Sequence, residues 1–179
     1  MPLFDPFPVL HTPRLHLRAP CLADAPDFHR HDTDPQVRRY LSRPPPSSLA
    51  VTEAKVAGMV DNTDAVAWVL ADATTGAFLG YACLWHWDQL NARAELGYVL
   101  DPARWGQGLV PEALTPILQF GFERMSLHAI EAWVHPDNHA SIRVLAKLGF
   151  IKEAHFREHE LNLNTHSWDD VLVYTLLRP

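Results

Sequence analysis

The sequence predicts an α/β (α+β) fold: a mixed central sheet of about seven strands with flanking helices, in a single domain spanning residues 1–179. Two observations support this prediction. The chain has 179 residues, of which 47% are hydrophobic and 20% charged, the size and composition of one globular domain. Apolar segments with strand periodicity follow one another up to residue 100 and alternate with helical segments afterwards. That order indicates antiparallel pairing early in the chain and parallel pairing in the middle of the sheet.

The N-terminal third is predicted to contain one strand and three helices. Residues 12–19 alternate leucines with polar side chains, which is typical of an edge strand. The dipeptide Asp34-Pro35 provides an N-cap followed by proline at the first helical position, and Ser48 is a second candidate cap. Helices are expected at residues 22–32, 35–41 and 48–60.

A long apolar segment follows. Between Asp64 and Asp88 the only acidic residue is Asp72, and there is no Lys or Arg, so hydropathy alone would admit a membrane span. The Thr-Thr-Gly turn at residues 74–76 divides the segment, and both halves are rich in aromatic and β-branched residues. Two buried strands joined by a turn fit it better, and no membrane association is expected. These strands are predicted at residues 65–72 and 77–87.

The remainder of the chain is predicted to alternate strands and helices. A turn at residues 104–109 separates a strand from a helix, and Gly149 ends the next helix. The segment 171–177 is too apolar for an exposed edge strand, so it is expected inside the sheet. The predicted strands are 93–100, 129–134, 150–157 and 169–177, and the helices are 111–125 and 138–147.

Charge and cysteine content limit the classes of function. The chain has 15 basic and 21 acidic residues, and this net charge of -6 argues against a nucleic-acid-binding module. An acidic surface suits a cationic or amine-bearing partner. Two cysteines, Cys21 and Cys83, exclude a disulfide framework and favour reduced thiols. The N-terminal segment lacks the basic region of a signal peptide, so a cytoplasmic location is expected.

The turn after strand 93–100 contains Gly106 and Gly108. Backbone N–H groups converge at such a turn, and the N-terminus of the following helix adds partial positive charge, so the turn suits a pyrophosphate. The pattern is weak by itself, because a tight strand-to-helix turn has the same sequence. Pro111 stands where the dinucleotide-binding fingerprint has its third glycine, and the Gly-Lys-Ser/Thr of a nucleotide P-loop is absent. A Rossmann site and an ATP site are therefore not expected.

Four segments, in their order and spacing, resemble the GCN5-related N-acetyltransferase family. They are TPRLHLR near the start, AELGYVLDPARWGQGLVPEAL in the centre, NHASIRVLAKLGF after it, and REHE with WDDVLVYTLL at the end. Nearly the whole chain resembles the branch that acetylates the N-termini of ribosomal proteins. The resemblance implies transfer of an acetyl group from acetyl-CoA to a primary amine by direct attack in a ternary complex. It also implies that strand 93–100, the fourth, splays from strand 129–134, the fifth, to admit the pantetheine arm.

The resemblance also implies where acetyl-CoA binds. The family's turn, Gln/Arg-x-x-Gly-x-Gly/Ala, falls on Trp105, Gly108 and Val110. Tryptophan at the first position is usual in the ribosomal branch, whereas Val110 is a departure. Pro111 has no N–H, so a phosphate contact there is lost. The implied cofactor-binding residues are Val99 and Leu100, whose backbone N–H groups would polarise the thioester, Arg104, Trp105, Gly106, Gln107, Gly108, Leu109 and Val110 in the turn, and Asn138 and Ser141 in the next helix.

Ser141, Asn138 and Glu95 are the catalytic candidates. Many relatives have a tyrosine that protonates the leaving thiolate where this chain has Leu145, and Ser141 is the typical alternative in the ribosomal branch. Asn138 would orient the cofactor or a water, and both Asn138 and Ser141 also suit simple capping of a helix. Glu95 lies beside the expected splay and is the first candidate base, unless it belongs to a solvated strand face. A modest base suffices for an α-amine of pKa about 7.7–8.0, whereas a lysine at about 10.4 needs more help.

Several residues are candidates for the amine-binding side. Trp85 and Trp87 alternate along one strand, so one face is predicted to carry both indoles, in the core or lining the pocket. His135 ends the neighbouring strand and is the second candidate base, unless it is an exposed loop histidine. Glu158 and Glu160 would bind an ammonium group, unless they belong to a solvated hairpin. The substrate-side candidates are Trp85, Glu95, His135, Glu158 and Glu160.

A zinc-peptidase pattern, H-x-x-E-H, occurs at residues 155–159. The pattern holds a metal only on a helix, where the two histidines share a face. This segment is predicted as a strand, in which the two histidines lie about 13 Å apart at ~3.3 Å per residue. No metal site is therefore predicted.

Two classes of function remain open from the sequence. The first is an acetyl-CoA-dependent N-acetyltransferase, whose acceptor is a protein N-terminal α-amine or, alternatively, a small-molecule amine such as an amino acid, a polyamine or an antibiotic. The second is a non-catalytic acyl-CoA-binding or interaction protein, because of Leu145 and the altered turn at Val110 and Pro111. A homodimer fits the branch, but no residue argues for one.

Overall fold

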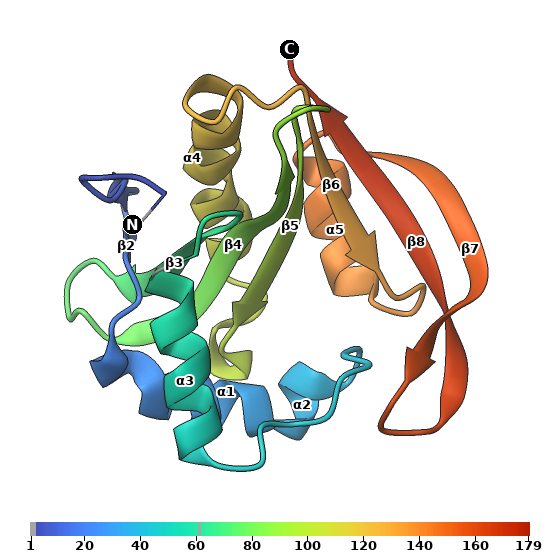
Figure 1. The fold of residues 1–179 in the computed structure, drawn as a ribbon, viewed down its shortest axis with the longest axis horizontal. Helices are drawn as coiled ribbons and strands as arrows, with labels where there is room; N and C mark the ends of the chain where they lie inside the picture. Colours follow the sequence, from blue (N-terminus) through green and yellow to red (C-terminus); the bar gives the residue numbers. More distant parts are fainter. Residues whose placement is uncertain (1–2, 61) are drawn as a thin grey trace.

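The computed structural model describes residues 3–60 and 62–179. Its centre is an eight-stranded sheet in the order β1-β2-β3-β4-β5-β6-β8-β7 (Figure 1). The strands are β1 (Leu10–His11), β2 (Leu15–Arg18), β3 (Val66–Asp72), β4 (Phe78–Asp88), β5 (Arg93–Leu100), β6 (Ala129–Val134), β7 (Ile151–Asn162) and β8 (Ser167–Leu177). The α-helices are α1 (Ala25–Thr33), α2 (Pro35–Arg38), α3 (Leu49–Val60), α4 (Leu109–Glu123) and α5 (His139–Lys147), with 3-10 helices η1 (Leu22–Asp24) and η2 (Pro102–Arg104). The predicted mixed α/β fold is confirmed.

The order of strands in the sheet agrees with the sequence except at one edge. Every neighbouring pair is antiparallel apart from β5 and β6, which are parallel. The apolar strand β8 lies between β6 and β7, inside the sheet as predicted. The short strand β1 pairs with the outer side of β2. The prediction that β2 is the edge strand is therefore wrong, and β1 is the strand beyond the predicted seven.

The apolar segment between Asp64 and Asp88 forms β3 and β4, which pair from Val66 with Leu84 to Ala71 with Phe78. Trp68, at its centre, is fully buried. The prediction of two buried strands is confirmed, and the alternative of a membrane span is wrong for this segment. Within residues 3–60 and 62–179, no helix is both long enough and apolar enough to cross a membrane.

Helix ends follow the polar and glycine residues that the sequence supplies. The Asp34 side chain accepts hydrogen bonds from the backbone of the first turn of α2, and that of Asn138 accepts from the backbone N–H of Ser141 in α5. Gly149, with φ +87°, ends α5. Helix α4 begins at Leu109, two residues before its predicted start, because Gly108 adopts a left-handed conformation as its N-cap.

The β7–β8 hairpin is longer than predicted. The Asn162 side chain accepts hydrogen bonds from the backbone of Asn164 and Thr165 and donates to Asp169, so the chain turns sharply at the tip. Almost every residue of β7 is exposed. Without a buried face there is no alternation of apolar and polar residues, and the sequence therefore does not show where the strand ends.

Two hydrophobic cores lie on opposite faces of the sheet. The larger core lies against α4 and α5 and contains the fully buried Leu84, Ile130 and Leu145. The smaller lies against α1 and α3 and contains Phe28 and Val56. Successive side chains of β5 divide between these faces: Ala94 and Leu96 belong to the larger core, and Val99 packs against the smaller. The same alternation sends the chemistry-bearing side chains of β5 to two different faces.

A polar cluster in the smaller core holds α1 and α3 to the sheet. Asp32 of α1, only 4% exposed, accepts a hydrogen bond of 2.9 Å from the Tyr81 hydroxyl of β4. Its other carboxylate oxygen lies 2.5 Å from the Lys55 Nζ of α3. Burial lowers the pKa of Lys55, and the charge of Asp32 opposes this. Asp32 is therefore the anion that makes a partly buried ammonium and a buried phenol compatible with the apolar surroundings.

We expect Asp32→Ala to reduce the free energy of unfolding by about 3 kcal/mol, since it leaves Lys55 and Tyr81 without their shared partner. Asp27→Ala is the matched control on the same helix, because its carboxylate makes only an exposed ion pair with Arg30 and should cost under about 0.5 kcal/mol. Urea denaturation of both variants measures the difference. Equal stabilities would show that the cluster does not hold the helices.

Candidate active site

The central feature of the site is the separation of β5 from β6. In the part of the chain that the structure describes, their backbone pairing runs only from Arg93 with Ala129 to Glu95 with Glu131. Beyond Glu95, β5 continues beside β4 and β6 continues beside β8, so the two strands diverge (Figure 1). The splay predicted between these strands is confirmed, and it begins at Glu95.

The backbone of β5 offers hydrogen-bond donors to this splay. The amide of Asp101 donates to the carbonyl of Leu79 at 2.7 Å, on the β4 side. Amide directions alternate along a strand, so the amide of Val99 also faces β4, and those of Tyr98 and Leu100 face the splay. Of the two residues that the sequence offered as thioester-polarising donors, this geometry favours Leu100 over Val99.

The glycine turn has the shape that a pyrophosphate requires. Gly106 and Gly108 have φ of 74° and 75°, left-handed values that glycine adopts without strain. A Cβ at Gly106 would enter open space, so this side of the turn is accessible. The side chains of Leu109 and Val110 pack in or against the larger core, which leaves their backbone as the only part available to a ligand. The residues present therefore fit a phosphate group bound by backbone N–H groups at the start of α4.

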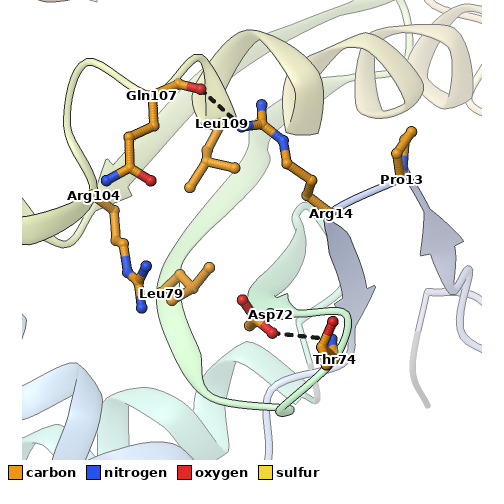
Figure 2. Close-up of a pocket in the computed structure, with 8 residues that line it drawn as sticks. All are labelled: Pro13, Arg14, Asp72, Thr74, Leu79, Arg104, Gln107 and Leu109. Carbon is orange, nitrogen blue, oxygen red and sulfur yellow. Dashed lines mark hydrogen bonds between the residues drawn. The ribbon is translucent and has the colours of Figure 1, made fainter.

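Side chains around the turn have specific positions. The Trp105 indole N–H donates to the Leu100 carbonyl at 2.8 Å, and the side-chain amide of Gln107 donates to the Ala103 carbonyl at 3.2 Å. Both interactions fix the turn to the end of β5 and to η2. Arg104 lines a cavity beside the turn together with Arg14 (Figure 2). The predicted turn residues therefore lie close together. The side chains of Trp105 and Gln107 are hydrogen-bonded to backbone carbonyls next to the turn.

Ser141 has a partner that the sequence analysis missed. Its Oγ lies 2.6 Å from the hydroxyl oxygen of Tyr98, so a hydrogen bond joins α5 to β5 across the splay. Burial raises the pKa of Tyr98 to about 12, so its phenol stays protonated at neutral pH. Tyr98 follows Ala94 and Leu96 on the side of β5 that faces the larger core, which is the signal that could have placed it near α5.

The helix position where many relatives carry a tyrosine is filled differently. Leu145 is fully buried in the larger core. A phenol is nevertheless present beside α5, because Tyr98 supplies it from β5. Asn138 is the N-cap of α5, and its side chain accepts from the Ser141 backbone N–H at 3.2 Å. The capping role of Asn138 is confirmed, and this cap sets the turn of helix that carries Ser141.

Glu95 lies on the opposite face from Tyr98. It pairs in register with Trp85, and its Oε2 lies 3.5 Å from Nδ1 of His86. The Glu95 side chain is 22% exposed. Burial raises its pKa, the neighbouring His86 opposes this, and the acidic Glu131 and Glu160 add to the rise. Glu95 is therefore a half-buried carboxyl at the point where the splay begins.

Trp85 and Trp87 do not share a face, contrary to prediction. The β4–β5 register is irregular between Trp85 and Asp88, and His86 has φ 50°. This irregularity breaks the strand alternation. Trp87 packs against the larger core, whereas Trp85 lies beside Gly97 on the Glu95 face and its ring stacks on His86.

The remaining substrate-side candidates lie in different surroundings. Glu160 is close enough to Glu95 to raise its pKa. Glu158 has φ 47° in an irregular part of β7, where its backbone N–H donates to Asp170, and nothing places its carboxylate beside Glu95. His135 is half-buried, and its ring packs on Tyr40, with centroids 5.3 Å apart. His135 thus lies in the loop after β6, as the alternative interpretation expected, but it is half-buried rather than exposed, and its role as a base stays a prediction.

Contacts between distant segments bound one side of the splay. At the tip of the β7–β8 hairpin, Leu163 donates its backbone N–H to the Ser42 carbonyl at 2.7 Å. Asn164 donates its side-chain amide to the Leu41 carbonyl at 2.8 Å. Together with the contact between Tyr40 and His135, these bonds join the α2–α3 connection to β6 and to the hairpin. Because the contacting residues are more than 90 positions apart in the chain, local sequence patterns could not predict these contacts.

Two further groups named from the sequence have structural roles. Burial raises the pKa of the Cys83 thiol to about 11, so it stays protonated at neutral pH. The H-x-x-E-H segment lies in β7, a strand as predicted, rather than on a helix. There His155 Nε2 lies 2.7 Å from Asp170, and His159 packs on Phe156 and Trp133.

Comparison with known proteins places this geometry in a family. The model of the acetyltransferase (GNAT) domain matches residues 14–151. An uncharacterized N-acetyltransferase of Bacillus licheniformis is 32% identical over 154 residues, which cover 84% of this chain and 86% of that protein. A GNAT-family acetyltransferase structure from Bacillus anthracis superposes with a TM-score of 0.84 at 24% identity, covering 95% and 98% of the two chains. The chain belongs to the GNAT acetyltransferase family.

Two other similar proteins carry names that state a substrate. The ribosomal-protein-serine acetyltransferase of Escherichia coli is 33% identical over 87 residues, which cover 49% of this chain and 48% of that protein. Spermidine N-acetyltransferase from Vibrio cholerae, in complex with CoA and spermine, has a TM-score of 0.84 at 21% identity, with 93% and 96% covered. The second likeness shows the fold alone.

The protein is therefore an acetyl-CoA-dependent N-acetyltransferase that acts on an amine. This outcome confirms the predicted enzyme class and cofactor, and the alternative of a non-catalytic acyl-CoA-binding protein is wrong.

Proposed function

We propose that the acceptor is the N-terminal α-amine of a protein, with Glu95 as the base and Ser141 as the acid. The observation that carries this proposal is the position of Glu95 at the start of the splay, with a pKa raised by burial. A carboxylate of this kind is a weak base. It suits an α-amine, whose pKa is about 7.7–8.0, better than an amine near 10.4.

The two faces of the splayed sheet separate the two proton transfers. Glu95 faces the α1–α3 side, where an amine would approach, and Ser141 lies on the α5 side with Tyr98. An amine that attacks a carbonyl carbon held between the strands enters from one face, and the leaving sulfur departs toward the other. As the new N–C bond forms, Glu95 would take a proton from the amine, directly or through water. As the C–S bond breaks, Ser141 would give its hydroxyl proton to the sulfur and regain a proton from water. The Leu100 amide would stabilise the negative charge on the carbonyl oxygen.

Bound acetyl-CoA supplies the activated acetyl group for this reaction. The backbone N–H groups from Gly106 to Val110 would hold its pyrophosphate, at the positive end of α4. Arg104 lines the cavity beside the turn, and its positive charge lies there rather than among these backbone N–H groups. Asn138 holds the first turn of α5 in place, and so would keep Ser141 in position to act on the sulfur.

The acceptor side supports a protein terminus as substrate. The contacts of Leu163 and Asn164 with the α2–α3 connection bound that side of the splay, which suits an extended chain end. The E. coli relative at 33% identity acts, by its name, on ribosomal-protein serine. The second candidate is a polyamine, because Glu131 and Glu160 add negative charge around Glu95.

Acetylation of matched acceptors tests the choice of substrate. One acceptor is a serine-initiated peptide with a free N-terminus, the second is the same peptide with a blocked N-terminus and an internal lysine, and the third is spermidine. We expect mass spectrometry to show acetyl transfer to the free α-amine and little to the other two. Faster transfer to spermidine, or to the lysine, would contradict the proposal and identify that amine as the preferred acceptor.

Ser141→Ala should lower kcat by tens-fold and leave the KM for acetyl-CoA nearly unchanged, since the hydroxyl acts only as the sulfur departs. Tyr98→Phe should lower kcat less, because Ser141 remains. Ser167→Ala, an exposed serine in the hairpin, is the control. A rise in KM with kcat preserved would mean that Ser141 binds the cofactor instead of acting as the acid.

Glu95→Gln should lower kcat/KM at pH 7 by about tenfold or more, because a general base contributes at least that much. The raised pKa of Glu95 means that its basic form is lost as pH falls toward that pKa. Above pH 9 the free amine predominates, so the difference from the wild type should narrow. A pH profile measures this, with Glu123→Gln on the exposed face of α4 as control. A loss that is constant from pH 6 to 10 would contradict a base role.

A further inference from the structure

Arg14, between β1 and β2, joins the start of α4 to the glycine turn. Its guanidinium contacts Oε2 of Glu112 through Nε at 2.7 Å and through a terminal nitrogen at 2.6 Å. Its other terminal nitrogen donates to the Gln107 carbonyl at 3.0 Å. Oε1 of Glu112 also accepts from the Thr12 hydroxyl at 2.6 Å and from the Arg14 backbone N–H at 3.0 Å. Arg14 is therefore held in one orientation against the turn.

Glu112 is the anchor of this arrangement. Its side chain is 18% exposed, whereas that of Arg14 is 50% exposed. Burial opposes the charged form of Glu112, but the hydrogen bonds from Thr12 and Arg14 outweigh it and lower the Glu112 pKa. Two contacts to one carboxylate fix the plane of the guanidinium, and this fixes the direction in which it can donate to Gln107.

The contact with Gln107 determines where the next amide points. A trans peptide is planar, with its C=O and N–H pointing in opposite directions. Because the Gln107 carbonyl points to Arg14, the Gly108 N–H must point away from Arg14. Gly108 has φ 75°, a left-handed value that other residue types rarely adopt, so this orientation of the peptide depends on glycine at position 108.

The cavity beside the turn lies on the carbonyl side of that peptide. It has a volume of about 240 Å³ and is lined by Arg14, Arg104, Asp72 and Leu79, with the Gln107 carbonyl directed to Arg14 (Figure 2). Its walls come from the β1–β2 and β3–β4 turns, from β4 and from the glycine turn with the start of α4, whereas the splay lies on the other side of β5, toward β6. The Gly108 N–H therefore points away from this cavity.

We propose that Arg14 is a positioning residue for acetyl-CoA: it fixes the Gln107–Gly108 peptide so that the Gly108 N–H is presented to the pyrophosphate. This inference rests on the proposed placement of the cofactor at the glycine turn. Arg14 does not bind the phosphate itself, because its guanidinium is committed to Glu112 and to the Gln107 carbonyl. Glu112 contributes to the same positioning because it holds the Arg14 guanidinium, although its negative charge would repel a phosphate nearby.

Charge and positioning make opposite predictions for Glu112→Gln. Removal of a negative charge near a bound phosphate should tighten binding, whereas loss of the anchor for Arg14 should weaken it. We expect calorimetry to show the dissociation constant for CoA rising about tenfold, or about 1.4 kcal/mol. Arg14→Lys, which keeps the charge but cannot contact Glu112 and Gln107 in one plane, should weaken binding equally. Glu123→Gln and Arg124→Lys, at the exposed end of α4, are the matched controls.

A second donor separates this role from a general loss of structure. S-acetylpantetheine carries the acyl arm without the pyrophosphate, so its kcat/KM should be unchanged in both variants, while the KM for acetyl-CoA rises about tenfold. Equal or tighter CoA binding by Glu112→Gln, or unchanged binding by Arg14→Lys, would overturn the positioning role of Arg14 and leave the proposed cofactor site standing. A parallel loss with both donors would show a structural defect and also overturn it. Wild-type protein that does not bind CoA would overturn both this inference and the proposed cofactor site.

Discussion

The early end of the pairing between β5 and β6 is the constraint on which the site depends. A continuous parallel ladder would use the amides of Tyr98 and Leu100 and would close the sheet. Because pairing ends at Glu95 and Glu131, there is an opening in the backbone pairing, and these amides have no partner in the β5–β6 ladder. The opening is stable because other contacts cross it. Tyr98 reaches Ser141 of α5, and the α2–α3 connection joins the hairpin tip at Leu163. The sheet is thus open in its pairing and closed by side-chain and loop contacts.

The position of the splay also explains why the two proposed proton-transfer groups come from different elements. Strand alternation sends Glu95 and Tyr98 to opposite faces of β5, and the two cores determine what each meets there. Tyr98 contacts α5, which lies over the larger core, and is partly buried. Glu95 lies on the other face, next to Trp85 and His86, and its side chain is partly exposed to solvent. One strand therefore places a partly solvated carboxyl on one face of the sheet and a partly buried phenol on the other, without any loop between them.

Much of the fold could be predicted because it follows from local signals. The cap at Asn138, the stop at Gly149 and the buried strands β3 to β5 depend on residues that are near one another in the chain. The glycine turn was found for the same reason. The face of Trp87 and the length of β7 were not predicted correctly. The irregular backbone between Trp85 and Asp88 changes the alternation, and β7 has no buried face to give it a periodic pattern.

The sequence by itself determined the order of elements, the position of the glycine turn and the resemblance to the family to which the chain belongs. Those features are local, because glycines, caps and periodicity act over a few residues. Only the tertiary structure decided which side chains meet. Tyr98 and Ser141, Tyr40 and His135, and Arg14 and Glu112 are each brought together by packing between elements distant in the chain. Hydrogen bonds of this kind depend on distance and direction between whole elements, and no periodicity in a single sequence carries that information.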